Sequence, residues 1–350
     1  MLNPIVLRVN GNDFGGWETA SVTASANEAV RTFNVTTSER RPDWPIKPQD
    51  EVEVVTFSGS GGDGDVLVKG YVDDYKASLD AESHTATISG RGKTCDIVDC
   101  SAVHETGRFE KKDIGEIANI LSKRYGVKIV VKAKNLKKIE RFHIQVGESV
   151  WSAVERIARS QDLMLVGGAD GSLEIHDSPE ELIDDALYEG EFLSIETEIS
   201  AKDRHSEYKV KGQRAFSAEA PDLKIEKKAV DGSIKRIRTK IIVAEGDLDN
   251  DGAEKRAKNE KSTRQGNSIK VDIMVSGFYR PKGGLWTPMK KIYVYSPTVH
   301  IDQTMAIESC EFSKDANDKT TTKLSLVDPK ALKDKSGDSR SKSDAAYKAD

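Results

Sequence analysis

The sequence is poor in cysteine and aromatic residues, and it has no long apolar run. Its three cysteines are too sparse and odd in number for a stabilising disulfide framework. No stretch approaches the roughly eighteen apolar residues of a membrane span, and the first residues lack the basic and apolar regions of a secretory signal. We therefore expect a chain that has no membrane anchor and is made and kept in the cytosol.

An excess of charge of one sign is also absent. The 53 basic and 58 acidic residues give a formal net charge of -5 and are spread along the chain. This balance argues against a dedicated binder of duplex nucleic acid. Apolar residues make up 37% of the 350 positions, which is enough for folded cores, and the length fits two or three domains.

Short alternating runs near both ends of the sequence predict antiparallel sheets. Up to about Gly92, runs such as residues 51–54 and 85–88 alternate apolar and polar positions and are separated by Gly, Asn, Asp and Pro. Alternation returns from about Tyr188, for example over residues 269–275. The first part is expected to form an antiparallel barrel or a sandwich, and strands are expected again in the second.

The middle of the chain has helical signals. Asp113 and Glu116 form a capping box before an apolar stripe, and Gly126 ends that helix. Ser149 caps a second amphipathic helix, and residues 163–175 then have the pattern of a hairpin. These elements predict a small α/β domain.

Two further segments differ in composition from the rest. A charged helix is expected from Asp249 to about Gln265, capped by Asp249 or Asn250, inside the second β region. The last residues, from Lys335, are low in apolar side chains and predict a disordered tail.

An internal repeat relates the two β regions. Residues 72–81 align without gaps on residues 307–316, and both segments read as a strand entering a turn with Ser-x-Asp-Ala at the same offset. A Thr-rich alternating strand follows each of them. We infer two related β domains on either side of the α/β piece.

Three motifs imitate ligand sites. The glycines of residues 59–64 match a dinucleotide-binding string, but a strand follows where the pyrophosphate would need a helix N-terminus, so a hairpin loop is expected. Residues 247–252 imitate a calcium loop, but Lys258 stands where a closing glutamate is needed. Cys95, Cys100 and His104 have nearly metal-like spacing but lack a nearby fourth ligand, which Cys310 could supply only in space.

No residue can be assigned a catalytic role. The six histidines are unpaired in the sequence, and no nucleophile elbow or carboxylate pair appears. We therefore expect no enzyme activity, no catalytic or metal site and no cofactor.

Two other functions remain possible from the residues. The segment Gly147 to Ser160 resembles a cell-wall carbohydrate-binding module, although such a module would continue into a second helix instead of a hairpin. A basic stretch could contact an acidic partner or nucleic acid, or could be a solvated strand face. It comprises Lys224, Lys227, Lys228, Lys235, Arg236, Arg238 and Lys240.

Taken together, the order of several phrases resembles the baseplate hub proteins of Mu-like contractile-tailed phages. The phrases cover most of residues 1–332 and include VNGNDFGGWETASVTAS (9–25), IKPQDEVEV (46–54), GYVDDYKASLDAESHTATISGRGKTCDIVDCSA (70–102), GGLWTPMKKIYVYSPTVHID (283–302) and TKLSLVDPKAL (322–332). The most telling is GRGKTCDIVDCSA followed by a helix.

The resemblance implies an α+β, mainly β fold with two related tube-like antiparallel β-barrel domains flanking a small central α/β domain. We place the first barrel at residues 1–95, the central domain at 96–186, the second barrel at 187–332 and the disordered tail at 333–350. A helix-bearing insertion is expected around 216–268, in a region that could belong spatially to the central domain.

The resemblance also implies a structural function. The chain would form a homotrimeric ring of near-sixfold symmetry in the tail baseplate of a virion, assembled in the host bacterial cytoplasm. The ring would join the tail tube, or neighbouring baseplate proteins, to the central spike and would pass DNA through its channel without sequence-specific binding. Trp17, Trp44 and Trp286 are candidate interface residues, or alternatively they cap the β cores.

Overall fold

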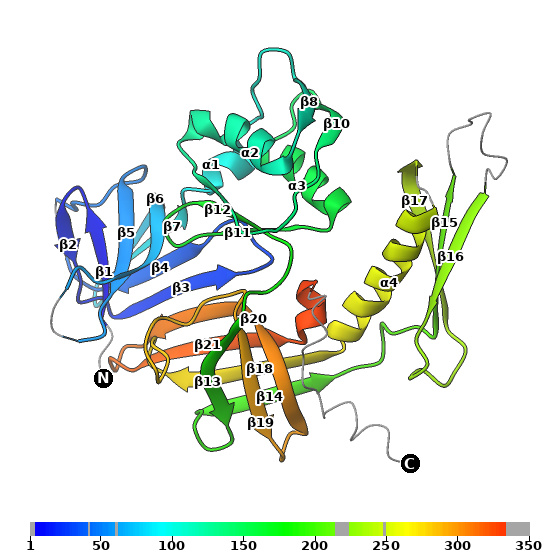
Figure 1. Cartoon of the computed structure of the whole chain (residues 1–350). Coiled ribbons are helices and arrows are strands. Elements are labelled where there is room, and N and C mark those ends of the chain that lie inside the picture. The colour runs from blue at the N-terminus through cyan, green and yellow to red at the C-terminus, as the bar shows by residue number, and fades with distance from the viewer. Residues whose placement is uncertain (1–3, 41–42, 60–61, 214–223, 248–249, 334–350) are drawn as a thin grey trace.

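The computed structural model describes residues 4–40, 43–59, 62–213, 224–247 and 250–333. The fold is mainly β (Figure 1). Strands from both ends of the chain form one large sheet, the central helices pack beside it, and a separate unit projects from the second half. No helix in these ranges has the length and apolar character needed to cross a bilayer.

The first β region follows the predicted alternation. Its strands are β1 (Ile5–Val9), β2 (Asn12–Phe14), β3 (Thr19–Ser25), β4 (Thr32–Thr37), β5 (Glu51–Thr56), β6 (Asp65–Leu79) and β7 (His84–Gly92). The long strand β6 pairs with β5 through its first part and with β7 through its second part. Gly59, Gly62 and Gly64 lie between β5 and β6, which pair as an antiparallel hairpin as predicted, and residues 60–61 of the loop lie outside the described residues.

The second β region has the same plan. It comprises β13 (Leu182–Tyr188), β14 (Ser194–Ile199), β18 (Ile269–Ser276), β19 (Lys291–Ser296), β20 (Ile301–Lys314), β21 (Thr320–Val327) and the short 3-10 helix η2 (Pro329–Leu332). Here β20 is the long strand, which pairs with β19 through its first part and with β21 through its second.

The two β regions are joined edge to edge. Strand β3 pairs with β20 from Ala20 opposite Lys314 to Ser25 opposite Ser309. The resulting path runs β14-β18-β21-β20-β3-β4-β7-β6-β5-β1-β2 and does not close on itself over the described residues. No closed barrel is found over the described residues, so the mainly β fold is confirmed and the expected tube-like barrels are not. Alternation predicts that one face of a strand is buried, but it does not determine whether a sheet closes.

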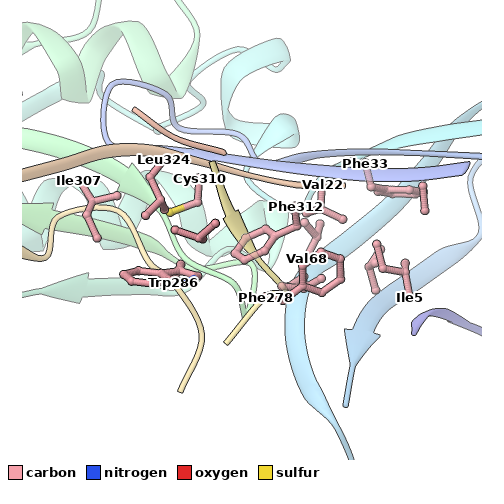
Figure 2. Close-up of a cluster of buried hydrophobic side chains, with 14 of the residues drawn as sticks. Ile5, Val22, Phe33, Val68, Phe278, Trp286, Ile307, Cys310, Phe312 and Leu324 are labelled. Atoms are coloured by element: carbon pink, nitrogen blue, oxygen red, sulfur yellow. The ribbon is translucent and has the colours of Figure 1, made fainter. Parts of the chain in front are cut away.

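A single core joins the two regions. Phe33 and Val22 of the first region and Phe312 and Leu324 of the second belong to one buried apolar cluster (Figure 2). Phe278 meets Phe312 edge to face, with ring centroids 5.4 Å apart. Because burial of each such side chain stabilises the fold by about 1.5–3 kcal/mol, this shared core holds the two halves in one orientation.

The central domain contains α1 (Cys95–Asp99), β8 (Arg108–Lys112), α2 (Ile114–Ser122), η1 (Lys123–Tyr125), β9 (Ile129–Val131), β10 (Ile139–His143), α3 (Val150–Gln161), β11 (Met164–Gly167) and β12 (Leu173–His176). Both reciprocal bonds of the predicted Asp113–Glu116 capping box are present. Gly126 is left-handed after η1, and Ser149 caps α3. The predicted hairpin is β11 with β12.

An inserted unit separates β14 from β18. It consists of a three-stranded sheet and a helix, namely β15 (Glu207–Gln213), β16 (Lys224–Val230), β17 (Thr239–Asp247) and α4 (Asn250–Gly266). Its own small core contains Val210, Ile225, Ala253 and Ala257. The predicted charged helix is confirmed, although its expected cap Asp249 lies outside the described residues. The unit follows β14 directly, so it begins before residue 216.

Candidate assembly surface

The aligned repeat segments adopt the same local structure. In β6 the pairing with β7 shifts between Val72 and Asp74, and in β20 the pairing with β21 shifts between Ile307 and Ser309. These are the same alignment positions, so each long strand carries an irregularity where it leaves one partner and begins the next. Such bulges bend a strand and increase its twist.

The equivalence extends beyond the hairpins. In the first region β7 pairs with β4 and β4 with β3, and in the second β21 pairs with β18 and β18 with β14. Strand β14 thus takes the place of β3. The turn of residues 26–31 connects β3 to β4, whereas the inserted unit connects β14 to β18.

Eight strands form a continuous antiparallel surface, in the order β14-β18-β21-β20-β3-β4-β7-β6. On the six inner strands, β18 to β7 in that order, the residues on one face are buried and those on the other are more accessible, whereas β14 and the second part of β6 have no buried residue. The accessible face is rich in hydroxyl and amide groups and also carries charged side chains of both signs, including Lys76, Glu198, Lys270, Asp272, Glu311 and Lys323. It includes Ser21, Thr23, Asn34, Thr36, Thr87, Ser89, Ser309, Ser313, Thr321 and Ser325.

Both ends of this surface are open strand edges. The second part of β6, from Asp74 to Leu79, pairs only with β7 among the described strands, and β14 pairs only with β18. Leu79 is 68% exposed and Ile199 is 36% exposed. Unpaired edges carrying apolar side chains are sites where another chain can add a strand.

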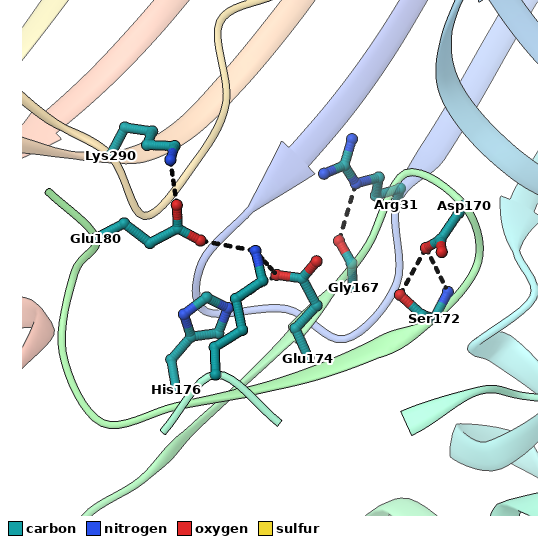
Figure 3. Close-up of polar contacts among 9 residues, drawn as sticks. Arg31, Gly167, Asp170, Ser172, Glu174, His176, Glu180 and Lys290 are labelled. Atoms are coloured by element: carbon teal, nitrogen blue, oxygen red, sulfur yellow. Dashed lines mark hydrogen bonds and ion pairs between the residues drawn. The ribbon is translucent and has the colours of Figure 1, made fainter. Parts of the chain in front are cut away.

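Arg31 connects the large sheet to the central domain. Its Nε donates to the carbonyl of Gly167 at 2.9 Å and its Nη1 to the carbonyl of Leu67 at 3.0 Å, in a buried setting (Figure 3). Burial lowers the pKa of this guanidinium. Nearby, the Thr94 hydroxyl donates to the carbonyl of Ala29 at 2.6 Å. The turn that precedes β4 is thereby anchored to β11 and to the start of α1.

A second polar cluster lies where the central domain meets the second β region. Glu180 accepts from Lys132 at 2.8 Å and from Lys290, and Glu174 lies 2.9 Å from His176 (Figure 3). Burial alone would raise the pKa of Glu180, but the bonds from the two lysines outweigh it and hold the pKa below its ordinary value. The cluster ties three separate segments together.

Glu174, His176 and Glu180 are also the only group of possible metal ligands in the part of the chain that the structure describes. Ammonium groups of Lys132 and Lys290 already neutralise these carboxylates. A divalent ion would have to displace them, so the arrangement suits an ion-pair network better than a metal site.

The three tryptophans lie in or against the β core. Trp17 and Trp286 are 4% and 2% exposed, which matches the alternative that they cap the core. Trp44 is partly buried and stacks on Tyr75 of β6, with ring centroids 5.8 Å apart. Trp44 is therefore the one of the three that lies next to an open edge.

The cysteine–histidine group, the calcium-like segment and the Gly147 to Ser160 segment lie in different parts of the fold. Cys95 and Cys310 are buried, and the ring of His104 lies 4.4 Å from that of Phe109. Residues 248–249 of the calcium-like segment lie outside the described ranges, and Lys258 pairs with Glu254 on α4 at 2.6 Å. The Gly147 to Ser160 segment includes most of α3, whose apolar residues contribute to the core of the central domain.

The basic stretch lies on the inserted unit. Lys228 pairs with Glu207 at 3.4 Å, and Arg238 donates to the backbone carbonyls of Ala201 and Lys202. The side chain of Lys224 lies outside the described residues. Lys227, Lys235, Arg236 and Lys240 complete the stretch, which belongs to strands β16 and β17 and the turn between them.

Comparison with known proteins identifies the relatives of this fold. Three family models match in succession: the N-terminal domain of Mu phage baseplate assembly protein GpP-like proteins over residues 4–92, the second domain of gp44-like baseplate hub proteins over 94–177, and the fourth domain of Mu phage baseplate assembly protein GpP over 250–335. Together they cover the first β region, the central domain and the chain from α4 to the end of the second β region, whereas β13, β14 and β15 to β17 lie outside the matched residues.

Individual proteins agree with these models. Baseplate hub protein gp44 of Escherichia phage Mu is 28% identical over 302 residues, which are 82% of this chain and 78% of the relative. The 43 kDa tail protein of prophage MuSo2 from Shewanella oneidensis has a TM-score of 0.83 at 27% identity, covering 94% of this chain and 99% of that one. A tail protein from Neisseria meningitidis MC58 shares the fold, with a TM-score of 0.79 at 22% identity over 95% and 98% of the two chains. The chain therefore belongs to the baseplate hub proteins of Mu-like phages and is a tail component of a virion.

Proposed function

We propose that three copies of this chain form a ring of near-sixfold symmetry that joins the tail tube to the central spike. The observation that carries the proposal is the eight-stranded antiparallel surface with two related halves and two open edges. Three copies of a chain that contains the same unit twice place six similar units around one axis. A structural role of this kind requires no catalytic residue.

The direction of the strands is compatible with ring closure. The eight strands alternate in direction, so the first and the last, β14 and β6, run antiparallel to each other. A neighbouring copy can therefore add its β14 to the β6 of this copy in the same antiparallel manner as β3 adds to β20. Closing the ring removes both edges, and with them the tendency of exposed strands to pair with unrelated chains.

The accessible face of the surface suits the wall of a channel. Hydroxyl and amide groups line most of it, and Asp272 is paired with Lys323 at 2.9 Å. A wall without a basic stripe would not hold the phosphate backbone, because affinity for DNA comes chiefly from Lys and Arg on phosphates. DNA could then pass through without sequence-specific binding.

The partners and the place of assembly follow from the family. A hub of Mu-like phages would contact the spike on one side of the ring and the tail tube or neighbouring baseplate proteins on the other. The central domain and the inserted unit lie beside the eight-stranded surface (Figure 1). In the ring they would lie outside the sheet and would contact the spike, the tail tube or neighbouring baseplate proteins. Assembly would take place in the host cytoplasm.

The test is the mass of the purified full-length chain in solution, combined with negative-stain electron microscopy of the same sample. A mass near three chains and rings with a central hole are expected. If the isolated chain is monomeric, the measurement is repeated after co-expression with the adjacent tail genes. Solid particles of monomer mass in both preparations would overturn the proposal.

A further inference from the structure

We infer the register of the subunit junction: Lys76 of one copy lies directly opposite Glu198 of the next, within a pairing that runs from Asp74 opposite Ser200 to Leu79 opposite Ile195. The inference rests on the proposed ring and adds to it which residues meet. The register is taken from the pairing of β3 with β20, which joins the two β regions within one chain.

The register follows from two matching rows of residues. Across the first region, Asp74 is opposite Ser89, Ser89 is opposite Asn34, and Asn34 is opposite Ser21. Across the second, Ser309 is opposite Ser325, Ser325 is opposite Asp272, and Asp272 is opposite Glu196. Glu196 is thus the counterpart of Ser21, and Asp74 is the counterpart of Ser309.

The internal junction then places the external one. Ser21 of β3 is opposite Ser313 of β20, and Ser25 is opposite Ser309. Ser78 is the counterpart of Ser313 in the ungapped alignment of the long strands. In the internal junction Ser21 is opposite Ser313, so their counterparts Glu196 and Ser78 should be opposite each other. Because the strands are antiparallel, a step of two residues along each then sets Glu198 opposite Lys76.

The side chains fit this register on both faces. On the face that points to the core inside the chain, Cys310 meets Ala24 and Phe312 meets Val22. At the junction the same face would bring together the pairs Tyr75 with Ile199, Ala77 with Thr197 and Leu79 with Ile195. Two of these pairs, Tyr75 with Ile199 and Leu79 with Ile195, are apolar, and directly opposed apolar pairs stabilise a sheet by roughly 0.2–1 kcal/mol each.

The accessible face fits as well. There a lysine, Lys76, meets a glutamate, Glu198, and both side chains are exposed in the single chain. A slip by two residues that set Lys76 against Glu196 would place Leu79 against Leu193 but would move Tyr75 from Ile199 to Thr197. A slip by two in the other direction would set Lys76 against Ser200 and Leu79 against Thr197. A slip by one would turn every apolar side chain to the polar face.

Trp44 gives the edge of β6 its support. Its ring stacks on Tyr75, the residue that would meet Ile199 of the neighbour, while its own side chain packs against the shared core. The stacked Trp44 ring therefore restricts the Tyr75 side chain to the orientation in which it can contact Ile199 of the neighbouring copy. Trp44 would act as a positioning residue for the interface.

Disulfide formation tests the register in the full-length chain. In a Cys100→Ser background, the pair Lys76→Cys with Glu198→Cys brings two thiols to directly opposed positions, whose Cα atoms lie about 4.5–5.5 Å apart in antiparallel strands, within reach of a disulfide. Oxidation should give covalent dimers and trimers on a denaturing gel. The variant with Ser78→Cys and Glu196→Cys should also form covalent dimers and trimers, and it tests the same register if the first double variant does not fold.

The matched control is Lys76→Cys with Ser194→Cys. Ser194 lies on the same face of β14 but is four residues from Glu198, or about 13 Å along the strand. The control pair and each single cysteine variant should stay unlinked. All variants are first shown to have the mass of a trimer in reducing buffer.

The outcomes separate the two proposals. A trimer in which only the control pair links, or in which no pair links, would overturn the register and leave the ring in place. A chain that is monomeric both alone and with its tail partners would overturn the ring and the junction together. Covalent trimers from both opposed pairs and from no control would establish the junction.

Discussion

Asp80 and Asp315 hold the same position in the two repeated hairpins. The Oδ1 atom of Asp80 accepts from the backbone nitrogens of Glu82 at 2.9 Å and Ser83 at 2.7 Å. The Oδ1 atom of Asp315 accepts from those of Asn317 and Lys319, both at 2.9 Å. Each carboxylate thus closes the turn that joins a long strand to the next, and these hydrogen bonds hold the pKa of Asp80 below its ordinary value.

Removing either carboxylate should loosen its hairpin. We expect Asp80→Ala and Asp315→Ala each to lower the midpoint of thermal unfolding, because two turn amides lose their acceptor. Asn at either position should restore part of the loss, since its amide oxygen can accept the same bonds. Glu82→Ala, in the same turn, is the control. Equal midpoints for Asp80→Ala and the control would show that the bonds contribute nothing.

Arg31 should be needed for the attachment of the central domain. Arg31→Met leaves the carbonyls of Gly167 and Leu67 buried without their donor, and each such group costs about 1–3 kcal/mol. We expect a loss of about 3 kcal/mol in the free energy of unfolding, measured by urea titration, and little recovery with Lys. Arg236→Met, at an exposed position, is the control. A loss below about 1 kcal/mol would contradict the role given to Arg31.

The Glu180 cluster should make stability depend on acid. Because its folded pKa lies below the ordinary value of 4.5, Glu180 contributes stability that is present above that value and is lost as the pH falls through the folded pKa. Glu180→Gln should cost about 1–2 kcal/mol at neutral pH, and the gap to the natural chain should shrink as the pH falls below 4.5 towards the lowered folded pKa. Urea titrations at several pH values measure this, with Glu105→Gln as control. A gap that does not change with pH would refute it.

The three thiols should differ in reactivity. Cys95 is buried and burial raises its pKa to about 11, and burial also raises the pKa of Cys310. Alkylation requires the thiolate, so at pH 8 we expect only the partly exposed Cys100 to react in the folded chain. Mass spectrometry should find one modified residue before unfolding and three after it. Rapid modification of Cys310 would show that the shared core opens.

Local patterns in the sequence were sufficient for local structure. Asp113 and Ser149 cap their helices as expected, because a cap depends on residues within one turn. The hairpin at residues 163–175 and the loop at 59–64 depend on neighbours in the chain in the same way.

Long-range relations were beyond the sequence. Alternation in β3 says that one face is buried, but not that β20, almost three hundred residues later, is its neighbour. The shared core follows from that one pairing, and whether each β region closes into a barrel could not be read from alternation. The role of Arg31 could not be predicted either, because the sequence around an arginine in a turn is the same whether the side chain is exposed to water or bonded to two buried carbonyls.

The repeat was the one long-range signal that the sequence held. The match between residues 72–81 and 307–316 marks two strands with the same bulge and the same turn, and it leads to the proposed junction. The tryptophans were harder to place, because a Trp between strands can face the core or a partner. Only Trp44 lies beside an open edge.

Leu79 provides the last prediction, which concerns assembly and not folding. Its side chain is 68% exposed in the single chain, so Leu79→Asp should change the free energy of unfolding of the monomer by less than about 0.5 kcal/mol. At the junction, however, the carboxylate would face Ile195 of the neighbour and lose water without gaining a partner. We expect association to weaken at least about tenfold, which corresponds to about 1.4 kcal/mol, as measured by sedimentation equilibrium. Val146→Asp is the matched control, because Val146 is fully exposed and belongs to the loop between β10 and α3 of the central domain. Equal weakening by both substitutions would point to a general effect of added charge, and no weakening by Leu79→Asp would place the interface elsewhere.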